Sequence, residues 1–196
     1  MRWSHWVGAA LLSTCVGQPQ APGDSEAPIV QRCTSAMKHK LPTAAALCEQ
    51  AWQETGSEAA AFAGAWIALW FHDDAGVERW RQRALPTVTG ARILRVVSDM
   101  QRRNGDFAGA EASLREALKL QIDLDPTRAA ATAGSLLELT QSNDSVKESL
   151  GFARIAWQQA VKSRYELGQA FAAKGLVEVL VDLGELSTAD AVVEWL

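Results

Sequence analysis

The sequence predicts an all-α fold, a solenoid of about five antiparallel helix pairs. Of its 196 residues, 48% are hydrophobic and 21% are charged, which is the composition of one soluble globular domain. Alanine is abundant, runs of β-branched residues are rare, and proline falls mainly between apolar blocks, so local preferences favour helix almost throughout. A triplet of small, large and small residues also recurs at intervals of about 33 to 43 residues, the period of helix-pair repeats.

The triplet has steps of four and three residues, which keep its members on one stripe of a helix. Small side chains in such a stripe let a neighbouring helix approach closely. In chain order the triplets are Ala44, Cys48 and Ala51; Val77, Arg81 and Ala84; Ala110, Leu114 and Ala117; Ala153, Trp157 and Ala160; and Ala189, Val193 and Leu196. An ordinary antiparallel bundle with small residues at its contacts stays open as the alternative.

Residues 1–17 are predicted to be an export signal and not part of the fold. Arg2 is followed by an apolar stretch that is too short to span a bilayer as a helix. The tetrapeptide LSTC resembles the lipobox of bacterial lipoproteins and makes Cys15 the predicted lipidation site, although Thr14 replaces the usual Gly, Ala or Ser. The alternatives are cleavage after Gly17 by an ordinary signal peptidase, and a cytosolic extension.

Residues 18–28, rich in Gln, Pro and Gly, predict a flexible linker before a helical domain at 29–196. An exported chain of this kind would be located in the bacterial cell envelope, as an anchored lipoprotein or in the periplasm; secretion is the alternative. Contact with a membrane is expected only through the lipid anchor.

Cys33 and Cys48 lie nearly symmetrically about the break at Pro42. If antiparallel helices flank this break, the two residues approach each other, and an oxidising compartment would maintain a disulfide between them. Two buried free thiols are the alternative. A zinc site that adds His39 lacks a fourth ligand and matches no structural zinc pattern.

The best-formed unit is Ala91 to Leu124, and its segment NGDFAGAEASLREALKL carries a distinctive pattern. A turn at Gly105 and Asp106 precedes a hydrophobic anchor and the triplet, and the last unit repeats this order in DLGELSTADAVVEWL. The anchors are Phe107 and Leu186, Gly184 matches Gly105, and Pro126 follows the first of these helices. In the family that this pattern indicates, the first helix carries a tryptophan followed by a leucine-glycine pair. The first helices predicted in this sequence lack that motif.

Over about residues 29–196 the pattern resembles the tetratricopeptide repeat (TPR) family. The resemblance implies a right-handed superhelical solenoid whose first helices line a concave face that binds a protein or peptide. The chain stops on a second helix without a polar capping helix, so we expect either a homo-oligomer formed through the C-terminal repeat or a longer protein. In the latter case it would be the scaffold or sensor region of a repeat-fused enzyme, such as a protease, with its catalytic domain beyond Leu196.

Two stripes are the candidate partner-binding surface, and the resemblance places both on the concave face. Phe62, Trp66 and Trp70 recur at steps of four as one aromatic stripe, for which core packing is the alternative. Segment 78–105 holds seven arginines and two acidic residues. On one predicted face of this segment lie Arg92, Arg95, Asp99, Arg102 and Arg103. A solvated arginine face is the alternative, but the planar guanidinium suits carboxylates and favours an acidic partner.

The sequence offers no catalytic constellation, and we predict a non-enzymatic scaffold without cofactor or bound metal. His72 with Asp73 and Asp74 resembles half of a metal site, but the companion histidines of a helical hydrolase are absent. These aspartates more simply begin a helix. The net charge of −4 and the lack of a phosphate-binding glycine loop argue against nucleic acid and nucleotide ligands.

Overall fold

The computed structural model describes residues 27–83, 86–142 and 145–195. Over these residues it contains ten α-helices and no strand, so the all-α prediction is confirmed. The helices are α2 (Pro28–Lys38), α3 (Ala44–Thr55), α4 (Glu58–Trp70), α5 (Asp74–Arg83), α6 (Val88–Arg103), α7 (Phe107–Gln121), α8 (Pro126–Ser142), α9 (Val146–Ser163), α10 (Glu166–Asp182) and α11 (Leu186–Trp195).

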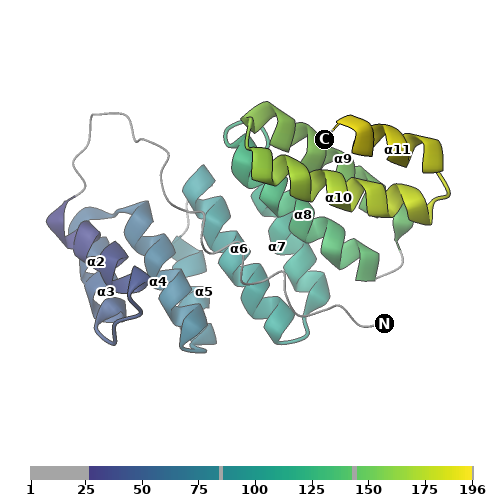
Figure 1. Ribbon diagram of the computed structural model, residues 1–196. Helices are drawn as coiled ribbons and strands as arrows, with labels where there is room; N and C mark the ends of the chain where they lie inside the picture. The colour runs from purple at the N-terminus through teal and green to yellow at the C-terminus, as the bar shows by residue number, and fades with distance from the viewer. Residues whose placement is uncertain (1–26, 84–85, 143–144, 196) are drawn as a thin grey trace.

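Consecutive helices pack as five pairs: α2 with α3, α4 with α5, α6 with α7, α8 with α9, and α10 with α11. Figure 1 shows the pairs following one another in a row from the purple to the yellow end of the chain. We call the leading member of each pair its first helix and the other its second helix. First helices also contact one another, α4 with both α2 and α6, and α8 with α10. This packing is that of a helical repeat.

The same backbone hydrogen bond closes the reversal within every pair. In each, an N–H group donates to the carbonyl oxygen five residues earlier, at 2.8 to 3.2 Å. The donor and acceptor pairs are Leu41 and Ala36, Asp73 and Ala68, Asp106 and Gln101, Ser145 and Thr140, and Glu185 and Leu180. This is the long hydrogen bond of the Schellman motif, which ends a helix on one left-handed residue.

The left-handed residue of this turn is glycine in only part of the chain. Gly105 and Gly184 have φ of 79° and 76°, while His72 and Lys40 occupy the same position with φ of 57° and 49°. Pair α4/α5, whose sequence matches the repeat least well, therefore has the same turn as its neighbours. His72 is an exposed turn residue, and its neighbour Asp73 accepts from the Gly76 N–H at 2.8 Å as α5 begins.

Two of the predicted triplets lie wholly where helices meet, whereas the middle residues Arg81 and Val193 of two others are exposed. Ala110, Leu114 and Ala117 are at most 1% exposed, and so are Ala44, Cys48 and Ala51. The apolar core is divided into successive clusters along the row, one over α2 to α4, one over α4 to α6, a small one between α6 and α7, and one over α7 to α11. Each pair is therefore stabilised by its neighbours, as expected for a repeat array.

A disulfide joins Cys33 on α2 to Cys48 on α3, with their Cα atoms 4.8 Å apart. Both residues are fully buried within the first apolar cluster. The bond links the two helices of the first pair close to the turn between them and so holds them together. The predicted lipidation site Cys15 and the predicted signal segment lie outside the described residues.

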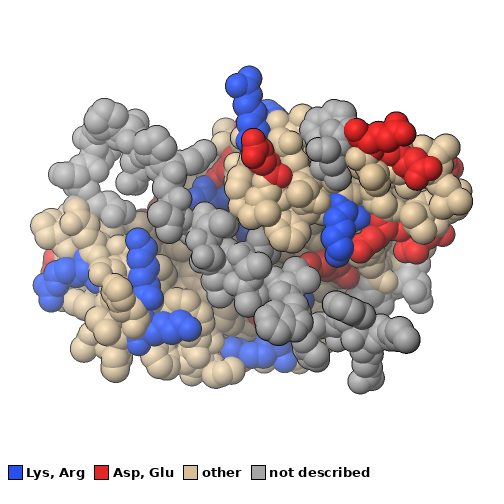
Figure 2. Space-filling model, viewed as in Figure 1, with Lys and Arg blue, Asp and Glu red and all other residues tan. Residues whose placement is uncertain are grey.

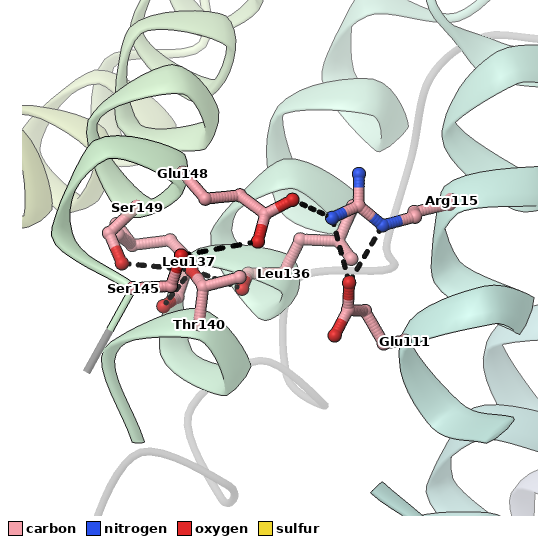
Figure 3. A network of polar contacts seen from close by, with 8 residues as sticks. All are labelled: Glu111, Arg115, Leu136, Leu137, Thr140, Ser145, Glu148 and Ser149. Atoms are coloured by element: carbon pink, nitrogen blue, oxygen red, sulfur yellow. Dashed lines mark hydrogen bonds and ion pairs between the residues drawn. The ribbon is translucent and has the colours of Figure 1, made fainter. Parts of the chain in front are cut away.

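A polar network joins α7 directly to α9 and includes side chains of α8 (Figure 3). Arg115 on α7 pairs with Glu111 at 2.7 Å and with Glu148 on α9. Its guanidinium also lies 4.9 Å from the ring centroid of Phe152. Nearby, the buried Ser149 hydroxyl donates to Thr140 Oγ1 at 3.0 Å. This network is structural, since its groups are bonded to one another.

The shared turn predicts opposite effects for two glycine replacements. Gly105→Ala should lower the free energy of unfolding by about 1 kcal/mol, because a Cβ disfavours positive φ. That Cβ would meet no neighbouring atom within 4 Å, so the cost comes from the backbone alone. Gly134→Ala, inside α8 and equally uncrowded, should raise it by up to about 1 kcal/mol. Urea unfolding followed by circular dichroism measures both, and equal effects would contradict the turn assignment.

The disulfide gives a second prediction. It closes a loop with a sequence separation of 15, and constraining the unfolded chain in this way stabilises by about 3 kcal/mol. Reduction, or the Cys33→Ser, Cys48→Ser double variant, should therefore lower the urea midpoint. Peptide mapping of unreduced, denatured protein provides the control: labelling of both thiols with a maleimide would show that the bond is absent.

Candidate functional site

The aromatic stripe lies along the first helix α4. Phe62 and Trp66 meet edge to face at 6.2 Å between ring centroids, and Trp66 and Trp70 are tilted at 5.8 Å. All three are half-buried, because one side of each packs against the apolar clusters. The stripe thus combines the two interpretations that the sequence left open, since it contributes to the core and also reaches the surface.

Cations lie over both ends of the aromatic stripe. The guanidinium of Arg92 on α6 is 3.6 Å from the centroid of Phe62. The amine of Lys40, in the turn after α2, is 5.1 Å from that of Trp70. These cation–π contacts connect the turn after α2, helix α4 and helix α6 in one surface. Arg92 thereby connects the aromatic stripe to the arginine face of α6.

On α6, Asp99 interacts electrostatically with both Arg95 and Arg102. Asp99 is exposed to solvent, yet the protein around it partly desolvates its carboxyl, and this burial raises its pKa despite the attraction of Arg95 and Arg102.

Two further charged residues belong to this surface and were missed from the sequence. Glu138 on α8 lies within electrostatic range of Arg102, Arg95 and Asp99, and of Lys174 on α10. Burial is the main cause that raises the pKa of Glu138, and the negative charge of Asp99 adds to it. Glu138 and Lys174 follow Arg102 at successive steps of about 36 residues, one repeat period each. That periodicity is the signal that could have found them.

We define the first-helix face by the residues that these contacts connect. They are Phe62, Trp66 and Trp70 of α4, Arg92, Arg95, Asp99 and Arg102 of α6, Glu138 of α8, and Lys174 of α10. The face runs from an aromatic part to a charged part in which cations outnumber carboxylates. It can bind apolar side chains at one end and carboxylates at the other.

Arg103 does not join this face, although the sequence grouped it there. Its guanidinium donates to the Leu69 carbonyl oxygen at 2.9 Å and pairs with Asp74 at the start of α5. Asn104 donates to the same carboxylate at 2.6 Å. One residue along a helix rotates the side chain by about 100°, which turns Arg103 towards the α4/α5 turn. Its role is to hold neighbouring pairs together.

A hollow of about 270 Å³ lies on another side, between α3, α4 and α5. Trp80 and small residues form its floor, where the Trp80 indole packs on the backbone of Gly64. The charged groups around it form ion pairs. The partners are Arg83 with Glu49 at 2.7 Å and Arg79 with Asp73 at 3.2 Å. The hollow therefore offers an apolar floor with mutually neutralised charges around it.

In the part of the chain that the structure describes, no three His, Cys, Asp or Glu side chains gather as metal ligands. The same part includes no helix that is both long and apolar enough to cross a membrane. No protein-family model matches the chain, and no curated protein resembles it in sequence. The geometry of the first-helix face is therefore what a functional interpretation must be built on.

The raised pKa of Asp99 gives a prediction with a defined sign. A carboxyl whose pKa is raised on folding weakens the folded state once it ionises, so its cost is absent below about pH 3.8, the ordinary value, and present at neutral pH. Asp99→Asn should raise the melting temperature at pH 7 by about 1 °C, since solvent screens an exposed group. The gain should shrink towards pH 4.

Asp123→Asn, in the exposed turn between α7 and α8, is the matched control and should change the melting temperature less. Differential scanning calorimetry at pH 7 and pH 4 measures both variants. A lower melting temperature for Asp99→Asn at pH 7 would mean that attraction to Arg95 and Arg102 outweighs burial.

Proposed function

We propose that this chain is a non-catalytic scaffold that binds a protein or peptide segment on its first-helix face. The observation that carries the proposal is the continuity of that face over α4, α6, α8 and α10. Desolvated carboxylates cost stability, and tryptophans that stay half-exposed offer apolar area to a partner, so both suit a surface used for binding.

The chemistry of the face indicates the kind of segment that it takes. Apolar side chains of a partner would pack between Phe62, Trp66 and Trp70, as aromatic anchors do in hot spots. Carboxylates would accept bidentate hydrogen bonds from Arg95 and Arg102. The partner segment is therefore apolar in one part and acidic in the next.

The proposal includes the finer fold, a right-handed TPR-like superhelix with this face on its concave side. The recurrent turn supports it, because a regular array of helix pairs requires a similar reversal within each pair. Glu138 on α8 interacts electrostatically with residues of α6, among them Asp99. This also supports a superhelix that curves towards the side of the first helices.

The proposed location is the bacterial cell envelope, as a lipoprotein or in the periplasm. It is supported by the disulfide between Cys33 and Cys48, since such bonds persist in oxidising compartments. The signal-like residues 1–17 give the second argument.

A peptide-display selection on the purified chain tests the function. We expect enrichment of segments with apolar residues next to Asp or Glu, and the Arg95→Glu, Arg102→Glu variant should bind them at least about tenfold more weakly. Arg154→Glu, on the exposed side of the second helix α9, is the charge-matched control and should bind them normally. Equal binding by both variants, or no enrichment, would overturn the proposal.

A further inference from the structure

The C-terminal end of the described chain is acidic, whereas a segment in its middle is basic. Lys174 is the single cation among the residues of α10, α11 and the turn between them, and the carboxylates there are Glu166, Glu178, Asp182, Glu185, Asp190 and Glu194. Figure 2 shows Asp and Glu gathered over the α10 and α11 end, and Lys and Arg mainly over the opposite half. Segment 78–105 in that half holds seven arginines against two acidic residues.

The outer side of α11 is apolar as well as acidic. Leu186 and Val193 are 59% and 55% exposed, and steps of four, three and one place them on one stripe with Asp190 and Glu194. Val193 has the triplet position that Leu114 and Cys48 hold in other units, where the side chain is at most 1% exposed. On α11, in contrast to these two units, this position is open to solvent, and the helix packs on α10 through Ala189.

This stripe matches the first-helix face in both respects. Leu186 and Val193 are two turns apart, about 10 Å along the axis, and Phe62 and Trp70 are about 12 Å apart by the same rise. Asp190 and Glu194 lie beside the apolar pair, as the arginines of α6 lie beside the aromatic stripe through Arg92. The segment that the proposed function calls for, apolar and acidic, is therefore present in the chain itself.

We propose that the α11 stripe of one copy docks on the first-helix face of a second copy. The inference rests on the proposed function and names its occupant. Two α11 stripes cannot pair with each other, because their carboxylates would repel, so the contact joins unlike surfaces, head to tail. Each docked copy leaves its own first-helix face or α11 stripe available to another, and the assembly grows with concentration into a ring or an open row.

Sedimentation velocity of the purified full chain, from micromolar to millimolar concentration, is the first test. The sedimentation coefficient should rise with concentration, and the rise should weaken as salt increases because the charges are exposed. Two variants should each raise the apparent dissociation constant at least about tenfold. One is Arg95→Glu with Arg102→Glu, and the other is Asp190→Lys with Glu194→Lys.

Mixing these two variants in equal amounts separates specific docking from general charge effects. Each variant alone has two surfaces of like charge, whereas in the mixture each acidic surface again has a basic counterpart. The mixture should therefore assemble as the parent does, while Arg154→Glu alone should leave assembly unchanged. Leu186→Ser with Val193→Ser, on exposed positions that do not disturb the core, should also abolish it.

A chain that stays monomeric throughout this range, or a mixture that fails to assemble, would overturn the self-docking proposal. If that chain still binds the selected apolar and acidic peptides, the proposed function survives with another partner. If it binds neither, both proposals fail. Circular dichroism of each variant verifies folding, and where the arginine variant does not fold, the serine variant decides alone.

Discussion

The architecture depends on one backbone hydrogen bond, repeated at each reversal within a pair. The N–H group that follows the turn reaches back to a carbonyl five residues earlier, which fixes both where the first helix ends and the direction in which its partner returns. Because this geometry recurs, the two helices of each pair pack against each other along the whole row. Second helices can then bury small triplets such as Ala110, Leu114 and Ala117, and the core continues from pair to pair without a single centre.

A consequence of that arrangement is a division of roles between the two helices of each pair. The side chains that form the core concentrate where two helices meet, and alanines there allow the helices to approach closely. The first helices also carry side chains that the core does not fully bury, including the half-buried tryptophans of α4, and charged groups of α6 and α8 that lie within electrostatic range of one another. Burial raises the pKa of Asp99 and Glu138, so keeping both costs some stability. Costs of this kind are expected where a surface serves binding.

Adjacent residues of one helix can reach different parts of the fold. Arg102 interacts with Asp99 and Glu138, whereas Arg103 pairs with Asp74 and caps the carbonyl of Leu69. The sequence grouped the two because a helical stripe is broad and a guanidinium is long. Which neighbour each arginine reaches depends on the turn of the preceding pair, and the α6 sequence carries no information about that turn.

The sequence by itself determined the all-α class and the small triplet residues at which helices meet. Helix propensity and triplet spacing are local properties that need no knowledge of neighbours. It also brought Cys33 and Cys48 into consideration through their symmetry about Pro42. Only the tertiary structure decided that His72 and Lys40 occupy the turn position of glycine, and that Glu138 and Lys174 join the first-helix face. A left-handed residue other than glycine leaves no mark in composition, and a surface shared by four helices exists only once their pairs have stacked.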